Sequence, residues 1–580
     1  MTAGTRAHRD RHLLRILTAL LREDVVGLRT RSTRVERPDG SWLRREHPGG
    51  ALALPVEPDG FQCEFAARLP LLRREEPGPA TDLDTTDAVL AALGDLADPA
   101  DRPGFDAFAD ECRQCLAAEL LHRDTRTEVV TRLAGAYGPD PAHWTDPLPF
   151  DTLAARLDHP VYPTGRGRLG LTDRHVRTYA PEFHPKFRLR WLALPRVDVV
   201  DEGLTAAPGW PAPSTLGLPR SLDADHIALP VHPLTAGAPL HGALKEAGLD
   251  DRAVLAEQPY AEVVPTLSMR TVALTAHPGT HLKVPLATAT LGRLNRRTIK
   301  PGTLRDGAAC QRLLAAVAAR EPRFDTTVLH ADETRYAHAG HEMLAVLRRR
   351  WPEGLDGSVV VPMAALTAPA PGGGLVIDRL ADRFHGGDPV ALLDAVLTLL
   401  FDWQTTLFGY GIALESHQQN ISLAFDDRPQ RPPLRLLFKD NDGPRVHTGR
   451  LRATLGAHDL SGFDDTRITG QDDRAVLDLF TTITVHLCAG APAFALARHG
   501  SAPLDRLLAL VRDRLGEAVE RLGTGPGQPG AALRAHILDA ARLPVKAMVT
   551  AGTLLTKQRS GAQDINKHYT TGPNYLLRGA

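Results

Sequence analysis

Cysteine is scarce in this chain of 580 residues, which contains only five, and this argues against a fold held together by disulfides. Cys112 and Cys115 form a lone CxxC within "DECRQCLAAELL", and no second pair completes a zinc site. The surrounding pattern is helical, so we interpret the two as half-buried structural thiols. The low cysteine content predicts a reducing, cytoplasmic compartment.

An excess of charge of either sign is also missing. The net charge is −1 and the isoelectric point is about 7.1, which argues against a nucleic-acid partner and against an anionic membrane surface. No apolar run reaches the roughly 18 residues that a membrane span requires. The segment "RHLLRILTALLRED" (11–24) carries Arg15 inside its apolar part, which predicts an amphipathic helix rather than a signal peptide.

Lysine is rare, with eight residues against 60 arginines. A chain so rich in arginine has little use for lysine as a generic surface cation. A lysine that remains is therefore more often one whose compact ammonium group a planar guanidinium cannot replace.

The length exceeds what one hydrophobic core normally supports, so we expect two or three lobes. Loops rich in proline and glycine divide the chain at 74–82, 205–221, 366–375 and 523–530. Residues 11–150 show mainly helical patterns, 155–300 alternate short strands with turns, and helical periodicity returns from about 380. These patterns predict an α+β protein of three lobes with antiparallel sheets and a helical C-terminal region.

A first predicted hairpin joins "ISLAF" (421–425) to "LRLLF" (434–438) through a charged, proline-rich turn. In an antiparallel pair the start of one strand lies beside the end of the other. The polar ends of the hairpin then bring together Glu415, His417, Asn420 and Asp440. Asn and Asp oxygens on neighbouring strand ends suit Mg²⁺ carrying a nucleotide phosphate, although a hairpin end that is merely solvated gives the same pattern.

A second predicted hairpin joins "PTLSMRTVALT" (265–275) to "HLKVPLA" (281–287). If residue 275 faces residue 281, Thr271 and Lys283 lie on one face, two pairs apart. The open end of the hairpin carries Ser268 and Arg270. A basic cluster follows, which is typical of a triphosphate or carboxylate clamp but also of a solvated loop: Arg293, Arg296, Arg297 and Lys300.

Two further stretches pair histidine with proline. "DHPVYPTGRGRLGL" (158–171) combines glycine with Arg166 and Arg168, which suits an anion-binding loop, whereas His232 in "LPVHPL" is more typical of a structural histidine. Motifs of zinc proteases, serine hydrolases, dinucleotide-binding folds and P-loop enzymes do not occur. A nucleotide site therefore depends on the two hairpins.

Seven motifs in one order resemble the NRPS-independent siderophore synthetases, the IucA/IucC or aerobactin-synthetase-like family. They are HPxYPxxRxRxG, PVHP, PTxSxRT, HLKxPL, GxxNRR, ExHxQN and KDxxG, and they extend from about residue 158 to 443. The C-terminal "LPVKAMV" and "GPNYL" are similar to the closing segment of that family. The first 150 residues carry no motif of this kind.

The resemblance implies a cupped hand of three lobes: a mainly helical thumb (1–155), β-rich fingers (156–375) and a helical palm (376–580). It also implies an ATP-dependent, Mg²⁺-dependent ligase. Citrate or a related carboxylic acid attacks the α-phosphate of ATP, and an amine or hydroxylamine then displaces AMP. The partners implied are these small molecules, and the resemblance also allows a homodimer.

By motif position, the resemblance assigns contacts with ATP or its metal to Ser268, Arg270, Thr271, Lys283, His417, Asn420 and Asp440, with Glu415 in support. The family's arginine corresponds to Arg296 or Arg297. His159 and Arg166 would face the phosphates or the acid. The roles implied as catalytic are those of Lys283, His417, Arg270 and Arg296, and the implied metal ligands are Glu415, Asn420 and Asp440.

This chain departs from the family pattern HPxHPxxK, because Tyr162 replaces the second histidine and Arg166 replaces the lysine. We interpret this difference as substrate tuning. The alternative function is a kinase-like phosphotransferase, because such enzymes also place an Asn and an Asp across a hairpin. Kinases, however, carry a catalytic Asp shortly before that Asn, where Glu415 and His417 stand here.

Overall fold

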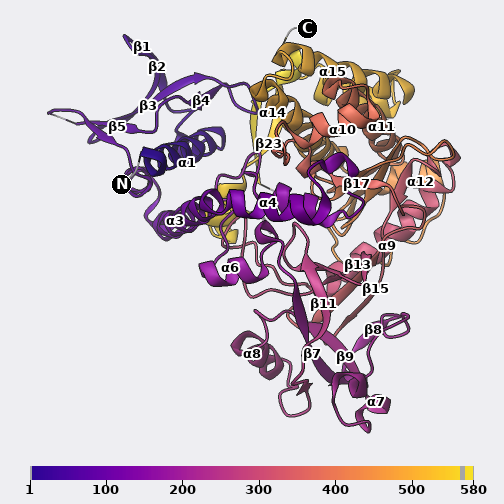
Figure 1. Ribbon diagram of the computed structural model, residues 1–580. Coiled ribbons are helices and arrows are strands. Elements are labelled where there is room, and N and C mark those ends of the chain that lie inside the picture. Colours follow the sequence, from indigo (N-terminus) through magenta and orange to yellow (C-terminus); the bar gives the residue numbers. More distant parts are fainter. Residues whose placement is uncertain (1–2, 77, 562–567, 579–580) are drawn as a thin grey trace.

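The computed structural model describes residues 3–76, 78–561 and 568–578 and shows an α+β fold (Figure 1). Helix α1 (Ala3–Arg22) is amphipathic as predicted, since its apolar side lies in the core. The N-terminal region then forms a six-stranded sheet that the expectation of a mainly helical region overlooked, with strands β1 (Thr33–Arg37), β2 (Gly40–His47), β3 (Gly50–Pro58), β4 (Phe65–Ala67), β5 (Leu72–Glu75) and β6 (Thr81–Leu83).

Four helices follow this sheet and lead to the middle of the chain. They are α2 (Thr86–Gly94), α3 (Arg102–Asp124), α4 (Arg126–Tyr137) and α5 (Leu148–Ala155). Thr85 begins α2 by accepting a hydrogen bond from the Ala88 amide through its side chain, a common N-terminal cap.

The middle of the chain forms a nine-stranded antiparallel sheet, as the alternating patterns predict. Its order is β10-β7-β11-β12-β13-β16-β15-β8, and β9 pairs with β7. The strands are β7 (Phe187–Pro195), β8 (Val200–Glu202), β9 (His226–Val231), β10 (Val254–Leu255), β11 (Tyr260–Pro265), β12 (Thr271–Leu274), β13 (His277–Lys283), β15 (Asp332–His338) and β16 (Ala345–Arg350). This sheet has its own hydrophobic core, and α9 (Pro301–Ala318) connects β13 to the strands beyond it.

A four-stranded sheet and a set of helices form the C-terminal part. The sheet has the order β14-β20-β19-β17, with strands β14 (Val328–His330), β17 (Val359–Pro362), β19 (Ile421–Phe425) and β20 (Leu434–Phe438). The main helices are α10 (Val376–Phe384), α11 (Pro389–Gly409), α13 (Asp473–Leu479), α14 (Ala491–His499) and α15 (Leu504–Arg521). β23 (Arg542–Lys546) pairs with β24 (Tyr569–Pro573) near the end of the chain.

We expected no segment long and apolar enough to cross a membrane, but the structure contains two such helical segments. Pro389–Gly409 and Asp473–His499 both have the length and the apolar composition of a membrane span. Their apolar windows are 67% and 94% buried inside the protein. Packing in the core therefore accounts for their apolar character.

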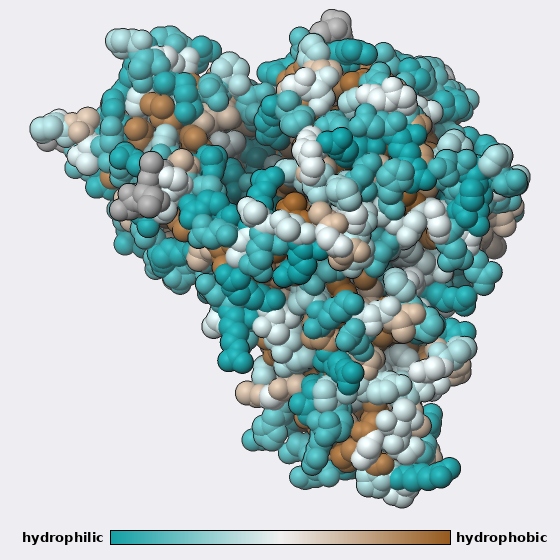
Figure 2. All heavy atoms as spheres, in the orientation of Figure 1, coloured by the Kyte–Doolittle hydropathy of each residue, from teal (hydrophilic) through white to brown (hydrophobic). Residues whose placement is uncertain are grey.

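One large core contains side chains from α1 and α3 together with those of the C-terminal helices. The first and last parts of the chain thus pack against each other, while the nine-stranded sheet extends away from them at the bottom of Figure 1. The face in Figure 2 is hollowed between the N-terminal sheet and the C-terminal helices. The division into three lobes near residues 155 and 375 stays a prediction.

Candidate functional site

The hairpin β19–β20 has the strand bounds and the antiparallel pairing that the sequence predicts. Ile421 pairs with Phe438, and Phe425 pairs with Leu434. Beyond the strands, the Lys439 amide donates a hydrogen bond to the carbonyl oxygen of Asn420 at 3.0 Å. All ten strand residues are buried, so the ribbon is rigidly packed and fixes the polar residues at its end.

Asp440 follows β20 at the centre of a charged cluster. Lys283 Nζ, on β13, lies 2.5 Å from Asp440 Oδ1 and 3.2 Å from Asp442 Oδ2. Arg349 Nη2 lies 3.4 Å from Asp440 Oδ1, and the Asp440 amide donates to Glu333 Oε1 at 2.9 Å. Burial alone would raise the pKa of Asp440, but Lys283, Arg349 and nearby Arg270 together lower it far below its usual value.

The second hairpin, β12–β13, forms with a register different from the predicted one. Thr271 pairs directly with Lys283 rather than lying two pairs away. The reason is a bulge between Ala273 and Leu274, and β13 already begins at His277, so the turn between the strands is shorter than predicted. Directly paired residues project from the same face of a sheet, so Thr271 and Lys283 share a face as predicted.

The loop before β12 carries the predicted hydroxyl and guanidinium groups. Ser268 Oγ lies 3.2 Å from Thr271 Oγ1. The backbone passes through a left-handed conformation at Met269, with φ of 63°, and this tight turn brings Ser268 and Arg270 to the open end of the hairpin. Arg270 donates to the carbonyl of Thr298, while its Nε is buried without a partner among the described residues.

The structure separates the two candidate arginines of the basic cluster. Arg297 is largely withdrawn from solvent, and its pKa falls to about 9 because of burial and the nearby positive charge of Arg270. Its Nε has no hydrogen-bond partner in the described part of the chain. The Arg296 side chain is 66% exposed and pairs with Glu342 at 3.1 Å. Arg297 therefore lies with Arg270 and Asp440, and Arg296 points away from them.

A second group of charges adjoins the same hairpin end. Lys546, at the end of β23, is 6% exposed, and its Nζ lies 3.7 Å from Glu415 Oε1. Burial, followed by the positive charge of Lys546, lowers the pKa of His417 to about 4. Burial and the neighbouring His417 lower the pKa of His159 to about 3, so both imidazoles are neutral at physiological pH. Asn420 donates through Nδ2 to the Glu415 carbonyl at 3.3 Å.

Residues of the N-terminal helices bind the loop around His159 and fix its position. His159 Nδ1 accepts a hydrogen bond from the Tyr162 amide at 2.9 Å. The Tyr162 hydroxyl donates to Glu111 at 2.8 Å and is fully buried, so the residue that departs from the family pattern contacts α3. Arg166 Nε lies 2.8 Å from an oxygen of Asp158. The guanidinium of Arg166 is thus occupied by a carboxylate of its own loop.

Sequence reasoning missed four residues of this cluster. Asp442 stands in "KDNDG" (439–443), the segment that matches KDxxG, and Lys546 stands in "LPVKAMV", where the rarity of lysine was an available signal. Glu333 and Arg349 form a buried ion pair that holds Asp440, but "ADETR" and "LRRR" look like ordinary surface strands. Only the packing of β15 and β16 shows that these two side chains face inward.

Both CxxC thiols are fully buried, rather than half-buried as the sequence suggested, because α3 packs them into the protein. Cys115 lies near His12 and Glu119, a combination that can hold a metal ion. However, Arg15 Nη1 lies 2.8 Å from Glu119 Oε1 and already supplies a positive charge there. The structural interpretation of the two thiols therefore stands.

Comparison with solved structures shows a known fold. The petrobactin biosynthesis protein AsbB from Bacillus anthracis superposes with a TM-score of 0.76 at 15% identity, covering 100% of this chain and 96% of that one. The ATP-bound aerobactin synthetase IucA from a hypervirulent pathotype of Klebsiella pneumoniae gives a TM-score of 0.68 at 19% identity, covering 98% and 100%. The fold is that of siderophore synthetases.

Sequence comparison agrees with the fold. Residues 150–368 match the model of the IucA / IucC family, and residues 391–562 match a model described as a ferric iron reductase FhuF-like transporter. Staphyloferrin B synthase from Staphylococcus aureus is 25% identical over 467 residues, which are 74% of this chain and 76% of that protein. Staphyloferrin A synthase from the same organism is 25% identical over 360 residues, 57% and 58% of the two chains. Over residues 150–368 the chain therefore matches the IucA / IucC family, and the relatives that it resembles in sequence and in fold include siderophore synthetases.

Proposed function

We propose that this protein is an ATP-dependent carboxylate–amine ligase of siderophore biosynthesis. It adenylates citrate or a related carboxylic acid and condenses the acyl group with an amine or hydroxylamine. The match of residues 150–368 to the IucA / IucC family supports the reaction class, and the ATP in one structural relative supports the nucleotide. The observation that carries the proposal is the convergence of Lys283, Arg270 and Arg297 beside Asp440 in a largely buried cluster.

The charge of this cluster suits adenylation. A carboxylate oxygen of the acid attacks the α-phosphorus of ATP, the bond from that phosphorus to the bridging oxygen breaks, and pyrophosphate leaves. Negative charge grows on the α-phosphate and on the leaving group. Fixed cations in a site shielded from water stabilise such charge without reorganisation. Arg270 and Arg297 have unpartnered buried Nε atoms among the described residues, which supports their availability for phosphate oxygens.

The residues around Asp440 fit a magnesium ion. Asp440 and Asp442 offer ionised carboxylates, and Asn420 offers an amide oxygen, the hard donors that Mg²⁺ prefers. In the structure Lys283 Nζ lies between the two carboxylates and balances their charge. When bound, Mg²⁺ would neutralise the pyrophosphate leaving group. The Glu415 carboxylate lies toward Lys546, which favours a supporting role for it over direct ligation.

The cluster around Lys546 suits the carboxylic acid. A buried lysine ammonium attracts a carboxylate, and neutral His159 and His417 offer ring nitrogens for hydrogen bonds without adding charge. In the second step the amine nitrogen attacks the acyl carbon, the bond from that carbon to the AMP oxygen breaks, and the amine proton passes to solvent. Holding the two reactants together supplies most of what this step needs. Arg297 is favoured over Arg296 as the arginine that faces the phosphates.

An acid panel tests the proposal. Purified protein with ATP and Mg²⁺ would be supplied with citrate, succinate or 2-oxoglutarate, and with hydroxylamine as a general acceptor. We expect pyrophosphate release that depends on one acid and a hydroxamate formed from it. Nucleotide turnover that is the same with and without every acid would contradict the proposal.

A further inference from the structure

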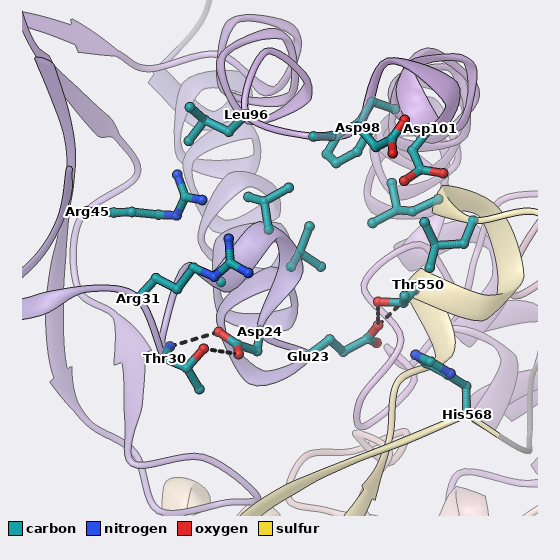
Figure 3. A pocket seen from close by; sticks show the side chains of 17 residues that line it. Glu23, Asp24, Thr30, Arg31, Arg45, Leu96, Asp98, Asp101, Thr550 and His568 are labelled. Atoms are coloured by element: carbon teal, nitrogen blue, oxygen red, sulfur yellow. Dashed lines mark hydrogen bonds between the residues drawn. The ribbon is translucent and has the colours of Figure 1, made fainter. Parts of the chain in front are cut away.

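A cavity of about 430 Å³ lies at the end of α1, away from the cluster around Asp440 (Figure 3). Its walls are the turn after α1, strand β2 and the turn Thr550–Leu554. None of the proposed ATP-site or acid-site residues lines it. A volume of this size accommodates a small organic ligand.

Two arginine side chains face this cavity, and neither donates a hydrogen bond to any group in the described part of the chain. Arg45, on β2, is only 7% exposed, and no described residue accepts a hydrogen bond from its guanidinium. Arg31 approaches it from the turn after α1, and Figure 3 shows both side chains reaching into the space. Burial, followed by the positive charge of Arg31, lowers the pKa of Arg45, and the Asp24 carboxylate offsets part of this effect. A buried guanidinium that faces a like charge costs free energy unless an anion compensates it.

The carboxylates around the cavity already have partners. Asp24, which lines the cavity beside Arg31, accepts hydrogen bonds from the Arg29 amide at 2.8 Å and the Thr30 amide at 2.9 Å, and from the Thr30 hydroxyl at 2.5 Å. It is therefore satisfied without an arginine side chain.

The acids on the opposite wall are also paired. Glu23 accepts hydrogen bonds from the amides of Val549 and Thr550 at 2.9 and 2.8 Å, and Asp101 accepts from Arg559 at 2.6 Å. Among the described residues of this cavity, the guanidinium groups of Arg31 and Arg45 thus lack a hydrogen-bond acceptor, whereas the carboxylates already have donors.

We propose that this cavity binds a small anion whose carboxylate or phosphate group accepts hydrogen bonds from Arg45 and Arg31. A guanidinium presents a planar fork of donors that matches both groups. The site is separate from the one proposed for adenylation, so it would hold its ligand whether or not ATP is bound. Free phosphate and a polycarboxylate such as citrate are the two sources of this chemistry.

Thermal unfolding of the full chain tests the proposal with inorganic phosphate and with citrate, each against chloride at equal ionic strength. Both salts stabilise proteins in general, so the specific part is the difference between wild type and Arg45→Gln. We expect the rise in Tm with the ligand anion to be at least halved in Arg45→Gln. The control is Arg34→Gln, because Arg34 is exposed on the neighbouring strand and paired with Glu36, and it should keep the full rise. An equal rise in all three proteins would overturn the proposal.

A second measurement uses the wild type alone, in case Arg45→Gln does not fold. Labelling with phenylglyoxal, read by peptide mass spectrometry, reports the accessibility of each arginine. Phosphate or citrate should slow the labelling of Arg31 several-fold and leave that of Arg34 unchanged. Whichever anion gives the protection identifies the source, and equal labelling of Arg31 with and without either anion would refute the site. Failure of the adenylation assay would not affect these readouts, because none depends on turnover.

Discussion

Replacement of Lys283 by methionine removes the ammonium group while keeping the apolar stem. Lys283 lies 2.5 Å from Asp440 and 3.2 Å from Asp442, and its side chain is 5% exposed. Removing one fixed charge that stabilises developing negative charge typically costs about 10²–10³ in rate, or roughly 2.7–4 kcal/mol. We therefore expect kcat/KM for acid-dependent pyrophosphate release to fall by about 10²–10³ in Lys283→Met.

The same change should lower the free energy of unfolding, because removing one partner of a buried ion pair costs roughly 3–5 kcal/mol. Arg349 remains 3.4 Å from Asp440 and still compensates part of its charge, so we expect a decrease of about 3 kcal/mol, measured by urea unfolding. The matched control is Lys300→Met, since Lys300 is exposed and should change neither quantity. Folded Lys283→Met with wild-type activity would refute the reasoning that this ammonium stabilises the transition state.

Four further predictions concern single residues. Arg297→Met should lower kcat/KM for adenylation by at least about 10²-fold, whereas Arg296→Met should keep kcat/KM within a few-fold of the wild-type value. Equal losses of kcat/KM in the two variants would contradict the placement of their side chains. His417 titrates at about 4 in the folded protein against an ordinary 6.5, so between these values the unfolded chain binds more protons, and its contribution to the free energy of unfolding should decrease as the pH falls from 6.5 to 4. A pH series of urea unfolding checks this by comparison with His417→Gln, which should show a weaker decrease. Lys546→Met should raise KM for the acid more than KM for ATP, and steady-state kinetics with each substrate varied would show the reverse if Lys546 served the nucleotide. Cys112→Ser should leave activity intact, and a large loss in a folded variant would mean that this buried thiol takes part in the chemistry.

The sequence predicted the parts of the site that are local in the chain. The hairpin β19–β20 has the predicted ends because each of its apolar runs stops at polar or proline residues. The prediction for β12–β13 differed by a bulge, which no residue pattern marked. The N-terminal sheet was overlooked because its strands are short and mixed with charged residues, so their alternation is weak.

Contacts between distant segments could not be predicted in the same way. Glu333 and Arg349 hold Asp440 only because β15 and β16 pair beside β13, and Lys546 reaches Glu415 only because β23 packs against the hairpin end. The choice between Arg296 and Arg297 likewise depends on which side chain the fold turns inward. Adjacent residues of equal chemistry cannot be separated without that packing.

The formation of an acyl-adenylate is the central claim, and transfer of oxygen-18 tests it most directly. The acid identified by the panel would be labelled with oxygen-18 in the reacting carboxylate and turned over with ATP, Mg²⁺ and hydroxylamine. Attack on the α-phosphorus predicts AMP that carries one oxygen-18 atom from the acid, together with unlabelled pyrophosphate. ADP and labelled inorganic phosphate would contradict the account, because they would place the attack on the γ-phosphate, as a kinase-like enzyme does.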